Sequence, residues 1–306
     1  MKIIGIGETV YDIIFRDNQP QRAVAGGSTY NAMISLGRTI GKDLLFISET
    51  GDDRIGRMII SFLRNNNIST DYMTVNKGTK SHISLAFLDE NNDAEYTFYK
   101  DHENASIPDT FPKVSRDDLV LFGSFFAVNP MIRPLTSKFL HMAHDAGAML
   151  YYDVNFRRPH LKDLPVIMPN IEENYRMASI VRGSSDDFQI MYGTSDMAEI
   201  YRKYVEPFCK TLIITDGAKP VKVFTSPDED PLMFDVHTSN DAIVSTIGAG
   251  DNFNAGFLYG LYKQGKDNNY ISPSDWEQLI ATAQRFSQAV CHSIENYVST
   301  DFINTL

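Results

Sequence analysis

Short runs of apolar residues alternate along this chain with segments whose apolar positions recur at helical spacing. The apolar runs are continuous, which is typical of strands that are buried on both faces of a sheet. Strands that alternate with helices predict a parallel sheet covered by helices on both sides. The predicted strands are Lys2–Glu8, Leu44–Glu49, Leu119–Phe122, Met149–Val154, Ile180–Arg182 and Leu212–Thr215. The predicted helices are Thr29–Thr39, Arg54–Asn65, Arg133–Ala146 and Ser195–Tyr204.

One region interrupts this alternation. Ser81–Asp89 and Ala94–Lys100 are both rich in β-forming residues, and only the polar residues 90–93 separate them. A helix does not fit into so short a connection, so the two runs predict an antiparallel hairpin. Such a hairpin would project from the main sheet, which makes it a lid over a site, a dimer surface, or both.

Composition narrows the classes of function. The 306 residues are 43% hydrophobic and 22% charged, as in an ordinary globular protein. The net charge of −11 repels nucleic-acid backbones and anionic lipid, so a nucleic-acid or membrane-surface partner is not expected. The two cysteines stand alone, the N-terminal residues do not resemble a signal peptide, and the apolar runs are too short to span a bilayer. We therefore expect a soluble, cytoplasmic protein.

A glycine-rich segment near the C-terminus carries the clearest chemical signal. Apolar residues recur every four positions from Phe253 onward, so a helix should begin near Gly250. Gly248-Ala249-Gly250 would leave the N–H groups of that helix end sterically open, and together with the helix dipole they favour an anion. Asp251 lies in the same first turn. It either complements the dipole or accepts the proton of a hydroxyl that attacks a bound phosphoryl group.

The same segment resembles the second signature of the ribokinase-like (PfkB) carbohydrate kinases, D-T-x-G-A-G-D, with Ser245 in place of the first Asp. The stretch from Ala25 through Asn31 to Leu36-Gly37 is similar to the first signature. The resemblance covers nearly the whole chain. It implies one three-layer α/β/α domain over residues 1–306, with a mostly parallel sheet and a small β-strand lid at about residues 10–27 and 73–103.

The resemblance also implies roles for single residues near the phosphoryl and sugar groups. Asp251 would be the catalytic base, and Gly248, Ala249 and Gly250 would form the anion hole. The sugar would be bound by Asp12, Gly27 and Asn31, whose carboxylate and amide groups suit a polyol.

A further motif follows a predicted strand, where open α/β sheets bind ligands. Asp153 to Arg157 is similar to the D-x-N-x-R motif of the fructokinase and 2-keto-3-deoxygluconate kinase branch. Asn155 and Arg157 would therefore face phosphate or substrate, and the guanidinium would supply local positive charge in an acidic protein.

The match is weaker on the nucleotide side. Ser184 and Asp187 occupy the place of the N-x-x-E motif, which organises magnesium and phosphates through water. Asp186 could share the role of Asp187, or the pair could be a helix cap. Thr215 and Gly217 resemble the loop that contacts the nucleotide, but Pro220 stands where a final Gly is common. A helix over 281–292 would flank adenine or simply pack in the core.

The resemblance thus implies a kinase that uses ATP and Mg²⁺ to phosphorylate a primary hydroxyl of a small sugar, with fructose favoured. A monovalent cation such as K⁺ near Ile243–Ile247 and a homodimer formed through the lids remain open. A first alternative is 2-keto-3-deoxygluconate kinase, for which Lys100, Tyr99 and Arg157 could contact the substrate carboxylate.

A second alternative is a non-catalytic sugar-binding regulator on the kinase fold. It is suggested by the departures from the family motifs at Ser245, Ser184, Asp187 and Pro220. The intact Gly-Ala-Gly-Asp segment, which would carry the chemistry, argues against it.

Overall fold

The computed structural model describes residues 1–89, 94–100, 106–236, 243–265 and 271–306. The strands of its large sheet are β1 (Ile3–Ile6), β4 (Leu44–Gly51), β5 (Ile68–Ser69), β6 (Met73–Asn76), β9 (Leu119–Gly123), β10 (Met149–Asp153), β11 (Ile180–Ser184), β12 (Leu212–Asp216), β13 (Lys219–Phe224) and β14 (Leu232–Phe234). Their order is β14-β13-β12-β11-β10-β9-β1-β4-β5, and β6 pairs with β4. Within the described residues, the antiparallel pairs of this sheet are β12 with β13 and β13 with β14, so the sheet is mostly parallel, as predicted.

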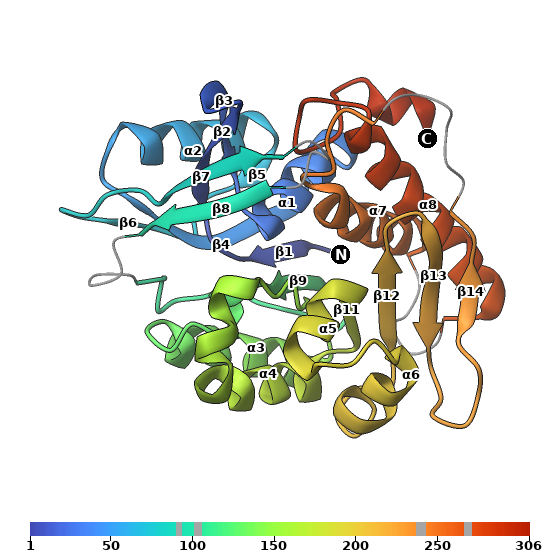
Figure 1. The fold of residues 1–306 in the computed structure, drawn as a ribbon. Coiled ribbons are helices and arrows are strands. Elements are labelled where there is room, and N and C mark those ends of the chain that lie inside the picture. Colours follow the sequence, from blue (N-terminus) through green and yellow to red (C-terminus); the bar gives the residue numbers. More distant parts are fainter. Residues whose placement is uncertain (90–93, 101–105, 237–242, 266–270) are drawn as a thin grey trace.

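Helices cover both faces of this sheet (Figure 1). On one face lie α1 (Ser28–Thr39), α2 (Arg54–Asn65), α7 (Ala249–Gln264) and α8 (Pro273–Cys291). On the other lie α3 (Arg133–Asp145), α4 (Leu164–Met177), α5 (Ser185–Tyr192) and α6 (Met197–Ile200). Successive strand residues point to opposite faces, so Ile3 packs in the first core and Ile4 in the second. The architecture is therefore the expected α/β/α arrangement.

A second, smaller sheet stands beside the first (Figure 1). It contains β2 (Val10–Arg16), β3 (Gln19–Gly26), β7 (Ile83–Leu88) and β8 (Ala94–Tyr99) in the order β3-β2-β7-β8. The antiparallel pairing of β7 with β8 confirms the predicted hairpin. Residues 90–93 and 101–103 of the expected lid lie outside the described residues. Met73–Asn76, which the sequence analysis grouped with the lid, pairs instead with β4 of the large sheet.

The helices of the C-terminal half differ most from the predictions. The helix predicted at 195–204 is a short α6 that continues as a π-helical turn over Tyr201–Val205. The helix expected from residue 281 already begins at Pro273, because Ser272 and Asp275 form a capping box at its start. The sequence analysis missed α4, whose interior contains Pro169. Within the described residues, every helix is too short or too polar to cross a membrane.

Candidate active site

A cleft of about 490 Å³ opens at the carboxyl ends of the parallel strands. Residues at or just after the ends of β1, β9, β10, β11 and β12 line it, together with side chains of the small sheet and the N-termini of α1 and α7. Open α/β sheets bind ligands at this edge. The residues that the sequence analysis proposed as catalytic, sugar-binding, nucleotide-binding or metal-associated all line this one cleft: Asp12, Gly27, Asn31, Asn155, Arg157, Ser184, Asp187, Thr215, Gly217, Gly248, Ala249, Gly250 and Asp251. Tyr99, which was suggested as a contact for a substrate carboxylate, is 59% exposed and is not among the residues that line the cleft.

The N-terminus of α7 forms the floor of the cleft. Gly248 caps the helix with a φ of 81°, and a Cβ atom there would lie 2.7 Å from the carbonyl oxygen of Asn296. Only glycine fits this left-handed, crowded position. The N–H of Ala249 already donates to the carbonyl of Thr246 at 3.2 Å. An anion bound here would therefore accept hydrogen bonds chiefly from the N–H groups that follow Ala249 in the first turn.

Asp251 is half-buried in this first turn and faces α1. Its Oδ2 accepts a hydrogen bond of 2.8 Å from Nδ2 of Asn31. Burial raises the pKa of Asp251 to about 6, although hydrogen bonds from Asn31 and Ser28 oppose the shift. At neutral pH the carboxylate is therefore mostly ionised, yet it is more basic than an ordinary aspartate. These are the properties that a general base requires.

Asp12 lies on β2 and is 8% exposed. The hydroxyl of Ser84 donates to its carboxylate, while burial, with the nearby charges of Glu8 and Asp251, raises its pKa to about 7. Close to it, Gly27 has a φ of 123°, and a Cβ there would lie 2.4 Å from the carbonyl oxygen of Glu8. The turn into α1 thus requires glycine, and it brings α1 close to Asp12.

Arg182, which lines the cleft, forms a buried ion pair with Asp153. Nη1 of Arg182 lies 3.1 Å from Asp153, and its Nη2 donates to the hydroxyl of Thr215 at 2.7 Å. Asn254 of α7 donates to the same Asp153 carboxylate at 2.7 Å. A Cβ at Gly250 would lie 3.0 Å from both Nη atoms, so the guanidinium is beside the first turn of α7. The sequence analysis gave Arg182 no role, although a cation within a buried strand could have signalled one.

Asn155 and Arg157 follow β10 into the cleft. Asn155 donates to the hydroxyl of Ser124 at 2.9 Å, and both residues have positive φ angles, of 36° and 54°. Arg157 is exposed and lies 6.0 Å from the ring of Tyr96 on β8. Tyr96 stacks on Phe98 within the hairpin, and it also lines the cleft, where burial raises its pKa to about 12.

Ser184 and Asp187 form a capping box at the start of α5. The Asp187 N–H donates to the Ser184 hydroxyl at 3.1 Å, and the Ser184 N–H donates to the Asp187 carboxylate at 2.8 Å. This is the helix cap that the sequence had left open. Burial raises the pKa of Asp187, and both residues still line the cleft. Among the residues that the structure describes, acidic, His and Cys side chains do not gather in threes as a direct metal site would need.

The end of the cleft at β12 is formed by a turn and, facing it, a helix. Thr215 lies near the end of β12, and Gly217 follows at a φ of 55°, with open space around the position of a Cβ. From the opposite side α8 contributes Gln284, Ser287 and Gln288. Pro220 lies within β13, after this turn, and does not fill the space beside Gly217.

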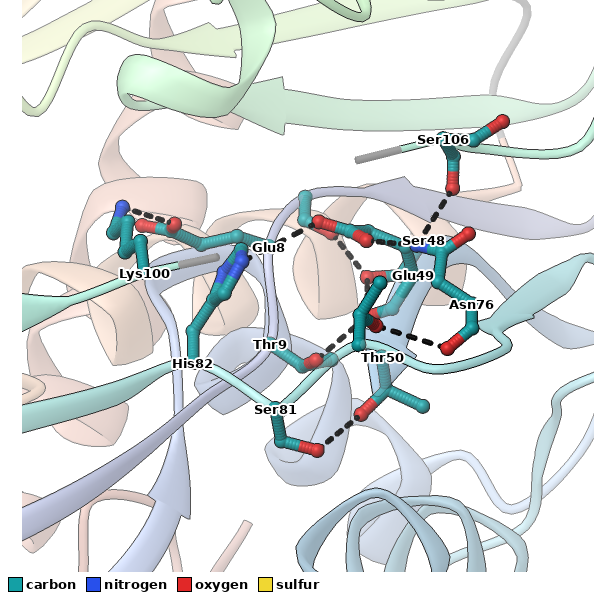
Figure 2. A network of polar contacts seen from close by, with 12 residues as sticks. Glu8, Thr9, Ser48, Glu49, Thr50, Asn76, Ser81, His82, Lys100 and Ser106 are labelled. Atoms are coloured by element: carbon teal, nitrogen blue, oxygen red, sulfur yellow. Dashed lines mark hydrogen bonds and ion pairs between the residues drawn. The ribbon is translucent and has the colours of Figure 1, made fainter. Parts of the chain in front are cut away.

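Polar contacts that the sequence analysis did not foresee join the large sheet to the hairpin (Figure 2). Lys100, directly after β8, lies 2.6 Å from Glu8, which follows β1. His82, directly before β7, lies 3.7 Å from Glu49 of β4, and Asn76 of β6 donates to the Glu49 carboxylate. Ile83 pairs with Tyr99, so both contacts lie at the open end of the hairpin and tie it to carboxylates in or next to the large sheet.

The two glutamates of this junction differ in basicity. Burial would raise the pKa of Glu8, but the charge and hydrogen bond of Lys100 outweigh it and leave the pKa lowered. Burial raises the pKa of Glu49 to about 7, and its hydrogen bond with Asn76 offsets only part of the shift.

Comparison with known proteins adds three findings. A model of the protein family described as pfkB family carbohydrate kinase matches residues 2–301 of this chain. The chain is 23% identical over 272 residues to a protein named probable fructokinase-6, chloroplastic, of Arabidopsis thaliana, covering 85% of this chain and 70% of that relative. It is 26% identical over 254 residues to the 5-dehydro-2-deoxygluconokinase of Geobacillus thermodenitrificans, covering 77% and 72%.

Among solved structures, the aminoimidazole riboside kinase of Salmonella enterica, complexed with aminoimidazole riboside and an ATP analog, has a TM-score of 0.82 to this chain. The identity is 21%, and the alignment covers 100% of this chain and 99% of that one. The likeness in fold thus extends over the whole chain, both sheets included.

Proposed function

Because this chain belongs to the pfkB family of carbohydrate kinases, which are phosphotransferases acting on a sugar hydroxyl, we propose that it transfers the γ-phosphoryl group of ATP to a primary hydroxyl of a small sugar, with fructose favoured. The observation that carries this proposal is the position of Asp251. Its carboxylate lies in the first turn of α7 and is bonded to Asn31, in the cleft that Asp12 also lines. A base, an anion cradle and polyol-binding groups are thus within one cleft.

In this mechanism Asp251 accepts the proton of the sugar hydroxyl as that oxygen attacks the γ-phosphorus. The new bond joins the sugar oxygen to phosphorus, and the bond from phosphorus to the oxygen bridging the β- and γ-phosphates breaks to release ADP. The N–H groups at the N-terminus of α7 would stabilise the negative charge on the transferring group. Arg182 lies beside Gly250, but Asp153 already pairs with it at 3.1 Å, so the N–H groups would carry most of this stabilisation. The proton then leaves Asp251 for solvent.

The sugar would lie between α1 and the small sheet. Asp12 and Asn31 would hold adjacent hydroxyls, because a carboxylate accepts and an amide both accepts and donates. Gly27 would let the backbone approach the sugar closely, and Asn155 and Arg157 would bound it on the β10 side. The fructokinase name of a relative supports fructose as the first acceptor to test.

ATP would lie along the ends of β11 and β12, with Thr215 and Gly217 on one side and α8 on the other. The residues at this place suit ATP for two reasons. The glycine-rich N-terminus of α7 favours its phosphates, and the space beside Gly217 is open, because a Cβ there would meet no atom within 4 Å. Magnesium, when bound to the phosphates, neutralises their charge. Asp187 would reach it through water and Ser184 would border the phosphates. K⁺ near Ile243–Ile247 belongs to the same proposal.

The small sheet would act as the lid. Lys100 and Tyr96 from β8 and its end line the cleft, so movement of the hairpin would change access to it. A closed lid would exclude water, which competes with the sugar as phosphoryl acceptor. A homodimer formed through the lids and a cytoplasmic location complete this part of the proposal.

A second candidate substrate is 2-keto-3-deoxygluconate. Arg157 is exposed and lines the cleft, so it could contact a carboxylate. Lys100 is less suited to that role, because Glu8 already neutralises it at 2.6 Å. A regulator without activity is disfavoured by the geometry of Asp251, which fits a base.

The test is ADP release with ATP and Mg²⁺ over a panel of fructose, 2-keto-3-deoxygluconate, ribose, glucose, tagatose and adenosine. Turnover that is strongest on fructose would support the proposal, and strongest turnover on 2-keto-3-deoxygluconate would favour the second candidate. Sugar binding in calorimetry without turnover on any member would support the regulator and contradict the kinase.

A further inference from the structure

Two consecutive residues of α7 are bonded to residues one turn apart on α1. Asn31 donates to the carboxylate of Asp251, and Ser35 donates to the side-chain oxygen of Asn252. Ser35 and Asn252 are both fully buried. The first turn of α7 is therefore fixed against the helix that begins at the sugar end of the cleft.

Every polar atom of the Asn252 side chain has a partner. Nδ2 donates to the carbonyl oxygens of Gly248, at 2.8 Å, and Asn296, at 2.9 Å. Oδ1 accepts from Ser35, whose hydroxyl in turn accepts from the N–H of Val298 at 3.1 Å. The amide cannot be reversed, because its oxygen would then face two carbonyl oxygens.

We propose that Asn252 is a positioning residue for phosphoryl transfer, which holds the anion cradle and Asp251 in register with α1 through its bonds to Gly248 and Ser35. This inference rests on the proposed function, since it assigns a role within that reaction. The carbonyl of Gly248 accepts from both the side chain and the N–H of Asn252. Because a peptide group is planar, fixing that carbonyl fixes the first peptide of the helix and hence the direction of the turn that follows.

The alternative is that Asn252 only fills and satisfies the core, so the experiment must separate the two roles. Asn252→Ala should lower kcat by about 100-fold with little change in the KM for sugar, because a small displacement of reacting groups costs rate more than binding. The matched control is Asn174→Ala. Asn174 is also fully buried, but it lies on α4 and accepts a bond of 2.7 Å from Arg133. It should lose a similar amount of thermal stability and keep its kcat.

Ser35→Ala provides a second variant in case Asn252→Ala folds poorly. It removes one of the bonds of Asn252 and should lower kcat in the same direction by a smaller factor. In the double variant the losses should be less than additive, because both residues act through one network. A kcat of Asn252→Ala and of Ser35→Ala equal to that of the Asn174→Ala control would overturn the proposal.

A measurement without turnover separates this proposal from the proposed function. Amide hydrogen exchange of the peptide containing residues 248–251 should be faster in Asn252→Ala than in the wild type and in Asn174→Ala. If the wild type phosphorylates no sugar, the proposed function fails and the exchange rates alone decide. Unchanged exchange at residues 248–251 would then show that Asn252 does not position this turn.

Discussion

The buried carboxylates of Asp12 and Asp251 and that of Glu8, all of which line the cleft, differ in the kind of group they are bonded to. Asp12 and Asp251 accept hydrogen bonds from the neutral groups of Ser84 and Asn31, and burial raises their pKa values to about 7 and about 6. Glu8 is paired with Lys100, and its pKa is lowered. A buried carboxylate with neutral partners stays basic, whereas one with a cation becomes a fixed charge that ties two elements together.

The largest effect should come from Asp251→Asn, which removes the basic oxygen and preserves the shape of the side chain. We expect kcat to fall by about 10²- to 10⁴-fold, the usual contribution of general acid–base catalysis. Sugar affinity, measured by calorimetry, should be largely kept, because Asp12 and the other proposed sugar ligands are unchanged. A variant with near-normal kcat would show that Asp251 is not the base.

Breaking the ion pair of Glu8 and Lys100 should change mainly the stability of the folded protein. Lys100→Met leaves the ionised Glu8 buried without its cation, so we expect the free energy of unfolding to fall by about 2–4 kcal/mol. Lys210→Met is the matched control, because Lys210 is 74% exposed and its pair with Glu206 should contribute little. Denaturant unfolding of both variants measures the difference. Equal losses would mean that the pair of Glu8 and Lys100 does not hold the hairpin to the large sheet.

Asp12→Asn should change stability in the opposite direction. The pKa of Asp12 is raised, so the folded state binds more protons than the unfolded chain between about pH 4 and 7, and the ionised group destabilises the fold above that range. The variant should therefore be more stable by about 1–3 kcal/mol at pH 8. The gain should shrink at pH 4, where wild-type Asp12 is protonated, and the KM for sugar should rise. A loss of stability at pH 8 would contradict this account.

The sequence predicted the central sheet, and the residues that it proposed for a phosphoryl site line one cleft, each for a physical reason. Continuously apolar runs, such as the one in β1, have few alternatives to a buried parallel strand, and Gly248 and Asp251 are brought together by the local geometry of one helix end. Residues that act through distant partners were missed. Arg182 meets Thr215 across neighbouring strands, and Glu8 meets Lys100 only after the hairpin has packed on the large sheet. The local pattern shows at most a cation within a buried strand, at Arg182, and it does not show which distant residues such groups contact.

The smallest expected effect is the response of the wild-type protein to pH. It separates the contribution of Asp251 to activity from that of the Glu8–Lys100 pair to stability. The base must be ionised to act, so kcat/KM should fall as the pH falls through about 6, the pKa of Asp251. The pKa of Glu8 is lower in the folded than in the unfolded protein. Its pair with Lys100 therefore stabilises the fold fully above the usual pKa of a glutamate, and this stabilisation is lost only as the pH falls through the lowered pKa of the folded state. Near pH 5 the protein should therefore be largely inactive and still folded, as activity and near-ultraviolet circular dichroism measured together would show. If unfolding accompanied the loss of activity, the fall would reflect the junction and not the base.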